Sequence, residues 1–278
     1  MKKVVSISGG QTSAYLAANY PADDYVFALI RTSDKSCEFK DRKLAAKVEE
    51  RIQMPFVGTL EDDVIISTIF DLEQYLGKPI NWVSGITYDD VVKYKGGWLP
   101  NKLHRYCTTE MKIKPLFEWW QKKFNVPVQM MIGFRANEQS RAKRMLEKTN
   151  TDGILEYKAI VGKRGNQNKW AMVAWQKPVF PLIDDAIFKD DIQRYWMDKP
   201  VRFAKANNCV GCFHRSIGLL KAMSEIHPEK LEWFAKQEGG KNGYWRSDLS
   251  YQKIIESNMQ FTFDFEESGC DSGYCGIS

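Results

Sequence analysis

Cysteine spacing is the feature of this sequence that most clearly suggests chemistry. The chain has six cysteines, which are Cys37, Cys107, Cys209, Cys212, Cys270 and Cys275. Four of them form two tight pairs. A thiolate is a soft ligand, and a Cys-x-x-Cys turn lets two sulfur atoms reach one ion. In a chain of 278 residues, the pairs favour metal or redox chemistry over stabilising disulfides.

A second candidate site is a glycine-containing loop near the N-terminus. Its residues are Ser8, Gly9, Gly10, Gln11, Thr12 and Ser13. The loop lies between a strand pattern at 3–8 and a helix pattern at 12–19. Glycines let backbone N–H groups turn toward a ligand, the hydroxyls add donors, and the helix N-terminus attracts anions. These features suit a pyrophosphate, although a tight turn with a capping hydroxyl explains the same residues structurally.

The elements around this loop alternate between strand and helix. Hydrophobic periodicity predicts strands at 3–8, 25–31, 55–58 and 128–132, and helices at 12–19, 38–52, 64–75 and 112–124. Such alternation is typical of an α/β protein with a parallel sheet covered by helices. Ligands are then expected at the carboxyl ends of the strands.

Two segments interrupt the alternation, and a smaller helical part follows it. Glycine, proline and aromatic residues at about 78–106 predict a long loop or lid, and short strand patterns at about 147–176 predict a hairpin excursion. We expect a nucleotide-binding domain at 1–185 and a helical, cysteine-containing region at 186–278. The basic stretch Lys163–Lys169 could contact a nucleic-acid backbone, although a solvated hairpin tip also explains it.

Composition is that of an ordinary folded protein. The chain is 44% hydrophobic and 27% charged, with a formal net charge of +5. This mild basic excess permits an anionic ligand without requiring nucleic acid. The apolar runs are too short for a membrane helix, and the N-terminus lacks the apolar core of a signal peptide. We therefore expect an intracellular, cytoplasmic protein that does not contact a membrane.

Four motifs in order along the chain resemble one known family. Ser-Gly-Gly-x-Thr-Ser after the first strand is similar to the PP-loop of the adenine nucleotide α-hydrolase-like superfamily. Within it, the chain resembles the phosphoadenosine phosphosulfate (PAPS) reductase family, in particular the type common in phages and mobile elements. The other motifs are Arg105–Leu116, with its Cys, Lys and Pro-Leu residues; Gly133–Arg141, which reads Gly-x-Arg-x-x-Glu-x-x-Arg; and the Cys-x-x-Cys of Asn208–Phe213.

This resemblance implies a Rossmann-like HUP sheet and an adenine nucleotide, either ATP or a sulfonucleotide (PAPS or its unphosphorylated form, APS). The residues Ser8 to Ser13 would then hold the phosphates. Arg135, Glu138 and Arg141 would lie at the next strand end, where the planar arginine side chain pairs well with phosphate or sulfate oxygens. Thr32 would lie near the adenosine.

The resemblance implies one of two sulfur chemistries. In the reductive version, Cys275 attacks the sulfur of a bound sulfonucleotide, and a thioredoxin-like reductant completes the release of sulfite. In the thiolation version, ATP adenylates an acceptor such as a nucleic acid, and a sulfur donor acts through a cluster held by Cys107, Cys209 and Cys212. The tail around Cys275 keeps the Cys-Gly of the reductases but not their flanking Glu and His.

The division of the cysteines among ligand sets stays open at this point. Cys107, Cys209, Cys212 and Cys270 would form a four-iron, four-sulfur (4Fe-4S) site like that of related reductases and thiolation enzymes. Zinc bound by both Cys pairs is the alternative, and a redox-active or buried pair is a third. With zinc, the chain could also be a non-catalytic module that senses nucleotide.

Overall fold

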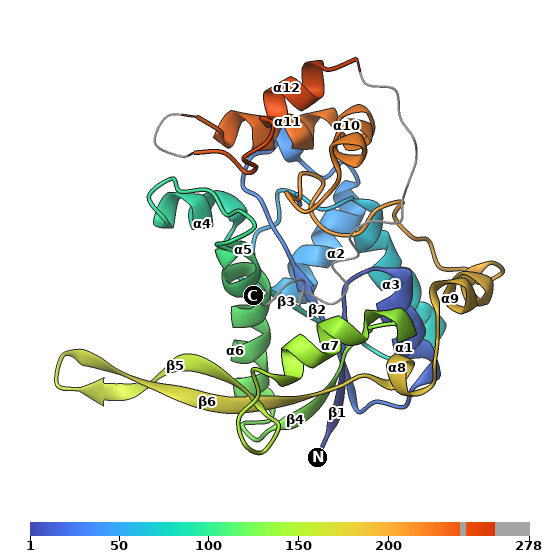
Figure 1. Ribbon diagram of the computed structural model, residues 1–278, viewed down its shortest axis with the longest axis vertical. Coiled ribbons are helices and arrows are strands. Elements are labelled where there is room, and N and C mark those ends of the chain that lie inside the picture. The colour runs from blue at the N-terminus through green and yellow to red at the C-terminus, as the bar shows by residue number, and fades with distance from the viewer. Residues whose placement is uncertain (240–242, 259–278) are drawn as a thin grey trace.

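The computed structural model describes residues 1–239 and 243–258 and has an α/β architecture built on one six-stranded sheet (Figure 1). The strand order is β3-β2-β1-β4-β6-β5, and every neighbouring pair is parallel except β5 and β6. The strands are β1 (Lys3–Ile7), β2 (Asp24–Leu29), β3 (Asn81–Ser84), β4 (Val128–Met131), β5 (Leu155–Arg164) and β6 (Gln167–Val179). The sequence-based prediction of a mostly parallel sheet covered by helices is confirmed.

Helices cover both faces of this sheet. The first part of the chain contributes α1 (Gln11–Asn19), α2 (Arg42–Ile52), α3 (Val64–Leu76), α4 (Tyr88–Tyr94), α5 (Tyr106–Thr108), α6 (Lys114–Lys123) and α7 (Gln139–Leu146). The later part contributes α8 (Pro181–Asp184), α9 (Lys189–Trp196), α10 (Ile217–Ile226), α11 (Pro228–Gln237) and α12 (Tyr251–Glu256). A π-helical turn, η2 (Thr109–Ile113), leads into α6, and short 3-10 turns lie at η1 (Lys35–Cys37) and η3 (Ala136–Glu138).

Alternating side chains of the central strands explain the two-sided covering. Val5 and Phe27 point into a core shared with α1, α2, α3 and α9. Their neighbours Val4 and Val26 point to the opposite face, where α6 and α7 pack. Because both faces of a parallel strand are buried, strand sequences such as Lys3–Ile7 are apolar nearly throughout.

A third core lies where the C-terminal helices meet the carboxyl end of the sheet. Trp233 of α11 stacks on Tyr88 of α4 with their ring centroids 5.3 Å apart, and its indole N–H donates to Asp89 at 2.9 Å. Phe234 packs on Trp245 at 5.0 Å. Figure 1 shows α10, α11 and α12 gathered at one end of the molecule. These helices therefore close over the sheet edge at which parallel sheets bind ligands.

The segment 78–106 is more regular than its composition predicts. It contains the edge strand β3 and the helix α4. Trp82 of β3 is buried between Phe27 at 5.1 Å and Phe70 at 4.9 Å, and this burial favours the strand. Thr87 caps α4 by accepting a hydrogen bond from the Asp90 N–H at 3.2 Å. The prediction of one long loop was wrong because these tertiary contacts override the local glycine and proline content.

Two other boundaries also differ from the prediction. The strand expected at 55–58 is absent: within the described chain this segment makes only isolated bridges, from Gly58 to Thr32 and to Glu38. The helix expected from residue 38 begins at Arg42, because Asp41 accepts the N–H of Leu44 and caps it. The hairpin excursion is confirmed as β5 and β6. No helix among the described residues has the length and apolar character needed to cross a bilayer.

Candidate functional site

The glycine loop predicted from sequence joins β1 to α1 and is held by its own hydroxyl groups. The Ser13 hydroxyl accepts the Ser8 N–H at 3.1 Å and lies 3.1 Å from the Gly10 carbonyl, to which it donates. Gly9 has φ +78°, and a β-carbon there would lie 2.5 Å from Ile65 Cγ2. Glycine is therefore required at this turn. Gln11 begins α1, and its carbonyl accepts the Trp196 indole N–H at 3.0 Å.

The Gly133–Arg141 segment lies directly beside this loop. Strands β1 and β4 are parallel neighbours, so the loops at their carboxyl ends meet. A β-carbon on Gly133 would lie 3.3 Å from Thr12 Cγ2 and 3.4 Å from the Ser13 nitrogen. The structure thus brings together two of the motifs selected from the sequence.

Arg135, Glu138 and Arg141 form one charged cluster after β4. Glu138 accepts the Arg135 backbone N–H and side chain, each at 3.0 Å, and it also pairs with Arg141. Burial alone would raise the pKa of Glu138, but the Arg135 N–H and the two guanidinium groups outweigh it and lower the pKa. Two cations share one carboxylate, so the cluster retains a net positive charge.

Arg141 has spare capacity to bind an anion. Its guanidinium lies over the Phe134 ring, 4.4 Å from the centroid. Its Nη2 atom is buried and has no acceptor among the described residues. A buried donor without a partner is costly. A phosphate or sulfate oxygen is the kind of group that would satisfy this one.

The third motif, around the Cys-x-x-Cys, reaches the glycine loop from the other side. Asn207 lies against Gly10, where a β-carbon would overlap the Asn207 side-chain amide. The next residues pair with the chain after residue 58: Val210 N–H donates to the Leu60 carbonyl at 2.7 Å, and Cys209 bridges Glu61. This pairing fixes the Cys-x-x-Cys turn a few residues from the candidate phosphate loop.

Cys107, Cys209 and Cys212 line one small cavity of about 40 Å³. Burial and the neighbouring Cys212 raise the pKa of Cys107 to about 11. Burial and the negative charge of Glu61 raise the pKa of Cys209 well above its usual value. Cys107 and Cys209 are therefore thiols at neutral pH, and each must lose a proton before it binds a metal or acts as a nucleophile.

Glu61 and Lys112 form a buried ion pair at the wall of this cavity. Their side chains are 3.0 Å apart and 1% and 10% exposed. Lys230, which is 1% exposed, donates to the Glu61 carbonyl and to Asp63, each at 2.7 Å. Burial alone would lower the pKa of Lys112, but Glu61 and the nearby thiols outweigh it and raise the pKa. Sequence reasoning missed Glu61, although the acidic run of residues 61–63 after an apolar segment was a signal for it.

The remaining predicted site residues are placed as follows. Thr32 is buried at the end of β2, where its hydroxyl donates to Asp89 at 2.7 Å. Cys37 is buried away from the other thiols, and burial raises its pKa to about 11. Cys270 and Cys275 lie outside the described residues. Over residues 1–239 and 243–258, no three Cys, His, Asp or Glu side chains stand close enough to share a metal ion.

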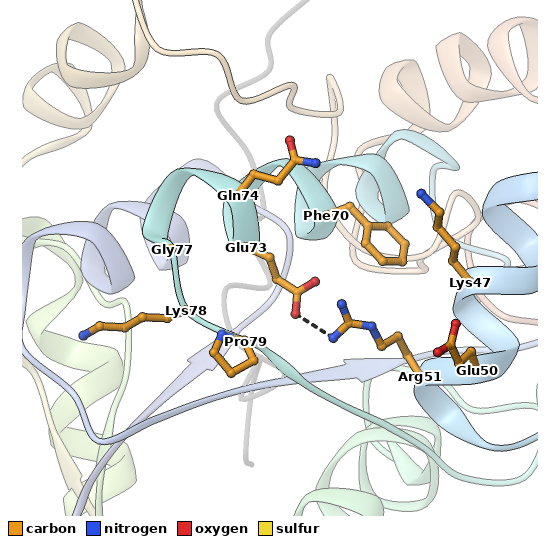
Figure 2. A pocket seen from close by; sticks show the side chains of 9 residues that line it. All are labelled: Lys47, Glu50, Arg51, Phe70, Glu73, Gln74, Gly77, Lys78 and Pro79. Atoms are coloured by element: carbon orange, nitrogen blue, oxygen red, sulfur yellow. Dashed lines mark hydrogen bonds and ion pairs between the residues drawn. The ribbon is translucent and has the colours of Figure 1, made fainter.

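A larger hollow of about 590 Å³ lies elsewhere, at the amino end of β3 (Figure 2). Arg51 pairs with Glu73 at 3.0 Å within it, and Figure 2 shows Lys47 and Lys78 pointing apart. Its lining does not converge on one point, and it includes none of the motif residues. We therefore assign the candidate site to the carboxyl edge of the sheet.

Comparison with known proteins adds no relatives to this description. The chain matches no protein-family model, and searches of curated proteins and of solved structures return no significant match. The functional assignment therefore depends on the motifs and on the geometry of the site.

The buried Glu61–Lys112 pair gives a first prediction. Glu61→Gln keeps the side-chain size but leaves the buried Lys112 without its counter-charge. Breaking a buried pair from one side costs about 3–5 kcal/mol, so we expect a loss of that order in the free energy of unfolding, measured by guanidinium denaturation. Glu50→Gln, on an exposed position of α2, should change it by less than about 0.5 kcal/mol. Equal effects of the two variants would contradict the role of the pair.

The Glu138 cluster predicts a pH dependence. Since the folded-state pKa of Glu138 lies below 4.5, its ionised form stabilises the fold above that pH, and this contribution is lost as the pH falls through the folded-state value. Glu138→Gln should therefore be less stable than the wild type at neutral pH, and the difference should shrink in acid. Urea unfolding across this pH range measures it, with the exposed Glu147→Gln as control. A difference that stays constant with pH would show that Glu138 does not titrate as described.

Proposed function

We propose that this chain is a PP-loop enzyme of the PAPS reductase-like kind, with a HUP-type sheet, that binds an adenine nucleotide for sulfur chemistry. One observation carries the proposal: three motifs distant in sequence meet at the carboxyl edge of the sheet. Gly10 contacts Asn207 on one side of the loop, and Gly133 contacts Thr12 on the other. Parallel α/β sheets bind ligands at this edge.

The charge distribution supports an anionic ligand at this place. The N-terminus of α1 presents the backbone N–H groups of its first turn, and its cap, Gly10, provides no side-chain acceptor for them. Arg135 and Arg141 add a net positive charge beside it. The unpartnered Nη2 of Arg141 supplies a buried donor. A nucleotide phosphate or sulfate would satisfy these groups together.

Entry of a nucleotide requires a local rearrangement. Ser8, Gly9, Gly10, Thr12 and Ser13 are all buried. The side chain of Asn207 lies over Gly10, and it is the group that must turn aside for phosphates to reach the loop. The Asn207 carbonyl is held by the Arg215 guanidinium, so the side chain can rotate while its backbone stays in place.

The thiol cavity supports thiolation as the form of the sulfur chemistry. Cys107, Cys209 and Cys212 share a cavity that begins two residues beyond Asn207. The reductive alternative needs Cys275 as nucleophile, and that residue lies outside the described chain. We therefore favour adenylation of an acceptor by ATP followed by sulfur transfer at the cavity, with the sulfonucleotide reaction as the second candidate.

An iron–sulfur cluster or zinc suits this cavity by donor chemistry. Three thiols lie within the field of Lys112 and Arg215, and both cations favour thiolates. The described thiols do not, however, stand at the spacing of metal ligands. We therefore assign no reaction step to a cluster. Metal and acid-labile sulfide, measured after anaerobic purification, distinguish iron–sulfur from zinc.

Nucleotide binding is the direct test. In isothermal titration with ATP and with PAPS, we expect Arg141→Gln to weaken binding by roughly 10- to 150-fold, because a charge-assisted hydrogen bond contributes about 1.5–3 kcal/mol. Arg144→Gln, on the exposed side of the same helix, is the matched control and should bind as the wild type does. Failure of the wild-type protein to bind either nucleotide would contradict the proposal.

The products separate the remaining alternatives. Pyrophosphate released from ATP supports adenylation, whereas sulfite released from a sulfonucleotide supports the reductase. A protein that binds nucleotide, contains zinc and releases neither product is a nucleotide sensor rather than an enzyme. Cys209→Ser should abolish thiolation and leave nucleotide affinity unchanged, since Cys209 lies in the cavity and not in the loop.

A further inference from the structure

The hairpin of β5 and β6 forms an arm that extends beyond the body of the molecule. In Figure 1 its tip projects away from the sheet and from every helix. Strands β5 and β6 stay paired from Leu155 to the turn between Arg164 and Gln167. Gly165 at this turn has φ +59°, as a tight hairpin turn requires. All residues from 160 to 170 are exposed.

The arm has an exclusively positive charge. From residue 157 to residue 183 there is no Asp or Glu, while the same stretch contains Lys158, Lys163, Arg164, Lys169 and Lys177. The whole chain has only five more cations than anions. A segment of 27 residues thus carries an excess of cations equal to that of the entire molecule. Such local concentration is typical of a surface that binds a polyanion.

One face of the arm combines these cations with apolar side chains. Ile160 pairs with Trp170, and Lys158 pairs with Met172, so the four side chains share a face of the ribbon. Trp170 is 54% exposed, and the Lys158 ammonium lies 5.9 Å from its ring. At the base of the hairpin, Tyr157 packs on α6 through Phe117. The exposed face has no such partner among the described residues.

Neither protection of a sheet edge nor insertion into a membrane accounts for this pattern as well. Lysines on an edge strand can simply prevent strand-to-strand aggregation, but a device of that kind would not expose Ile160, Trp170 and Met172 beside them. Insertion into an anionic membrane would require apolar residues at the outermost point of the arm. Its tip, from Lys163 to Lys169, contains only charged, amide and glycine residues.

The polar tip suits the edges of DNA bases. It presents the amides of Asn166, Gln167 and Asn168 between its cations. Asn and Gln side chains can form paired hydrogen bonds with adenine. The major groove of B-form DNA admits a two-stranded β-ribbon, whereas the corresponding groove of duplex RNA is too narrow.

We propose that the β5–β6 arm is a DNA-binding ribbon that enters the major groove of duplex DNA. The Lys and Arg residues of the tip contact phosphates, the amides face base edges, and Trp170 packs against the sugar-phosphate wall. This proposal does not depend on the nucleotide chemistry proposed above, because the arm and the carboxyl edge of the sheet are separate surfaces.

Fluorescence anisotropy with the full-length protein and a labelled DNA duplex tests the proposal over a range of salt concentrations. The logarithm of the binding constant should fall with the logarithm of the salt concentration, by about 0.9 per phosphate contact. The triple variant Lys163→Gln, Arg164→Gln, Lys169→Gln should bind more weakly, with a slope shallower by roughly 2–3. Trp170→Ala should weaken binding and leave the slope unchanged.

A matched control carries the same change of charge elsewhere. Lys35→Gln, Lys43→Gln and Lys47→Gln lie at exposed positions in η1 and α2, and together they should bind DNA as the wild type does. Equal losses in the two triple variants would overturn the proposal. So would tighter binding to single strands or to duplex RNA, or binding of the arm to phosphatidylserine vesicles but not to DNA. ATP titration of the arm variant should match the wild type, which keeps this test separate from that of the nucleotide site.

Discussion

The carboxyl edge of the sheet depends on the buried residue Glu61. Its backbone bridges Cys209, its carbonyl accepts the Lys230 ammonium at 2.7 Å, and its carboxylate pairs with Lys112 at 3.0 Å. One residue thus joins the Cys-x-x-Cys turn, α11 and the segment before α6. A buried ammonium without compensation is strongly destabilising. The three segments therefore adopt this arrangement together.

This constraint explains why the motifs meet although they lie far apart in sequence. The turn anchored at Glu61 carries Asn207 onto Gly10, at the start of α1. The parallel pairing of β1 with β4 brings Gly133 to the other side of the same loop. The result is an anion-binding edge, with Arg141 above it, next to a cavity lined by thiols. Phosphate binding and sulfur chemistry are neighbours in this arrangement, as the proposed function requires.

The parts of the structure that follow local patterns could be predicted from the sequence. Apolar runs such as Lys3–Ile7 identified the central strands, and the glycine loop was recognised because a positive φ at Gly9 requires that residue. The contributions of β3 and α4 were missed, because Trp82 forms a strand only when Phe27 and Phe70 enclose it. A strand was predicted at 55–58, but this segment makes only single bridges at Gly58 and so forms no ladder.

The site was predicted in its parts but not in its connections. Spacing identified Arg135, Glu138 and Arg141, and it also identified the Cys-x-x-Cys. The role of Glu61 could not be read from spacing, since its partners Lys112 and Lys230 lie 51 and 169 residues away. The contact between Gly10 and Asn207 has the same origin. Long-range burial of charge decides such contacts, and no local pattern encodes it.

Hydrogen exchange with and without nucleotide is the most direct test that the three motifs form one site. Saturation with ATP or PAPS should slow the exchange of backbone amides in residues 8–13, 133–141 and 207–212 together, because one ligand contacts all three segments. The exchange rates of the 590 Å³ hollow in Figure 2 should stay unchanged. Protection confined to one of the three segments, or found only at that hollow, would contradict the account.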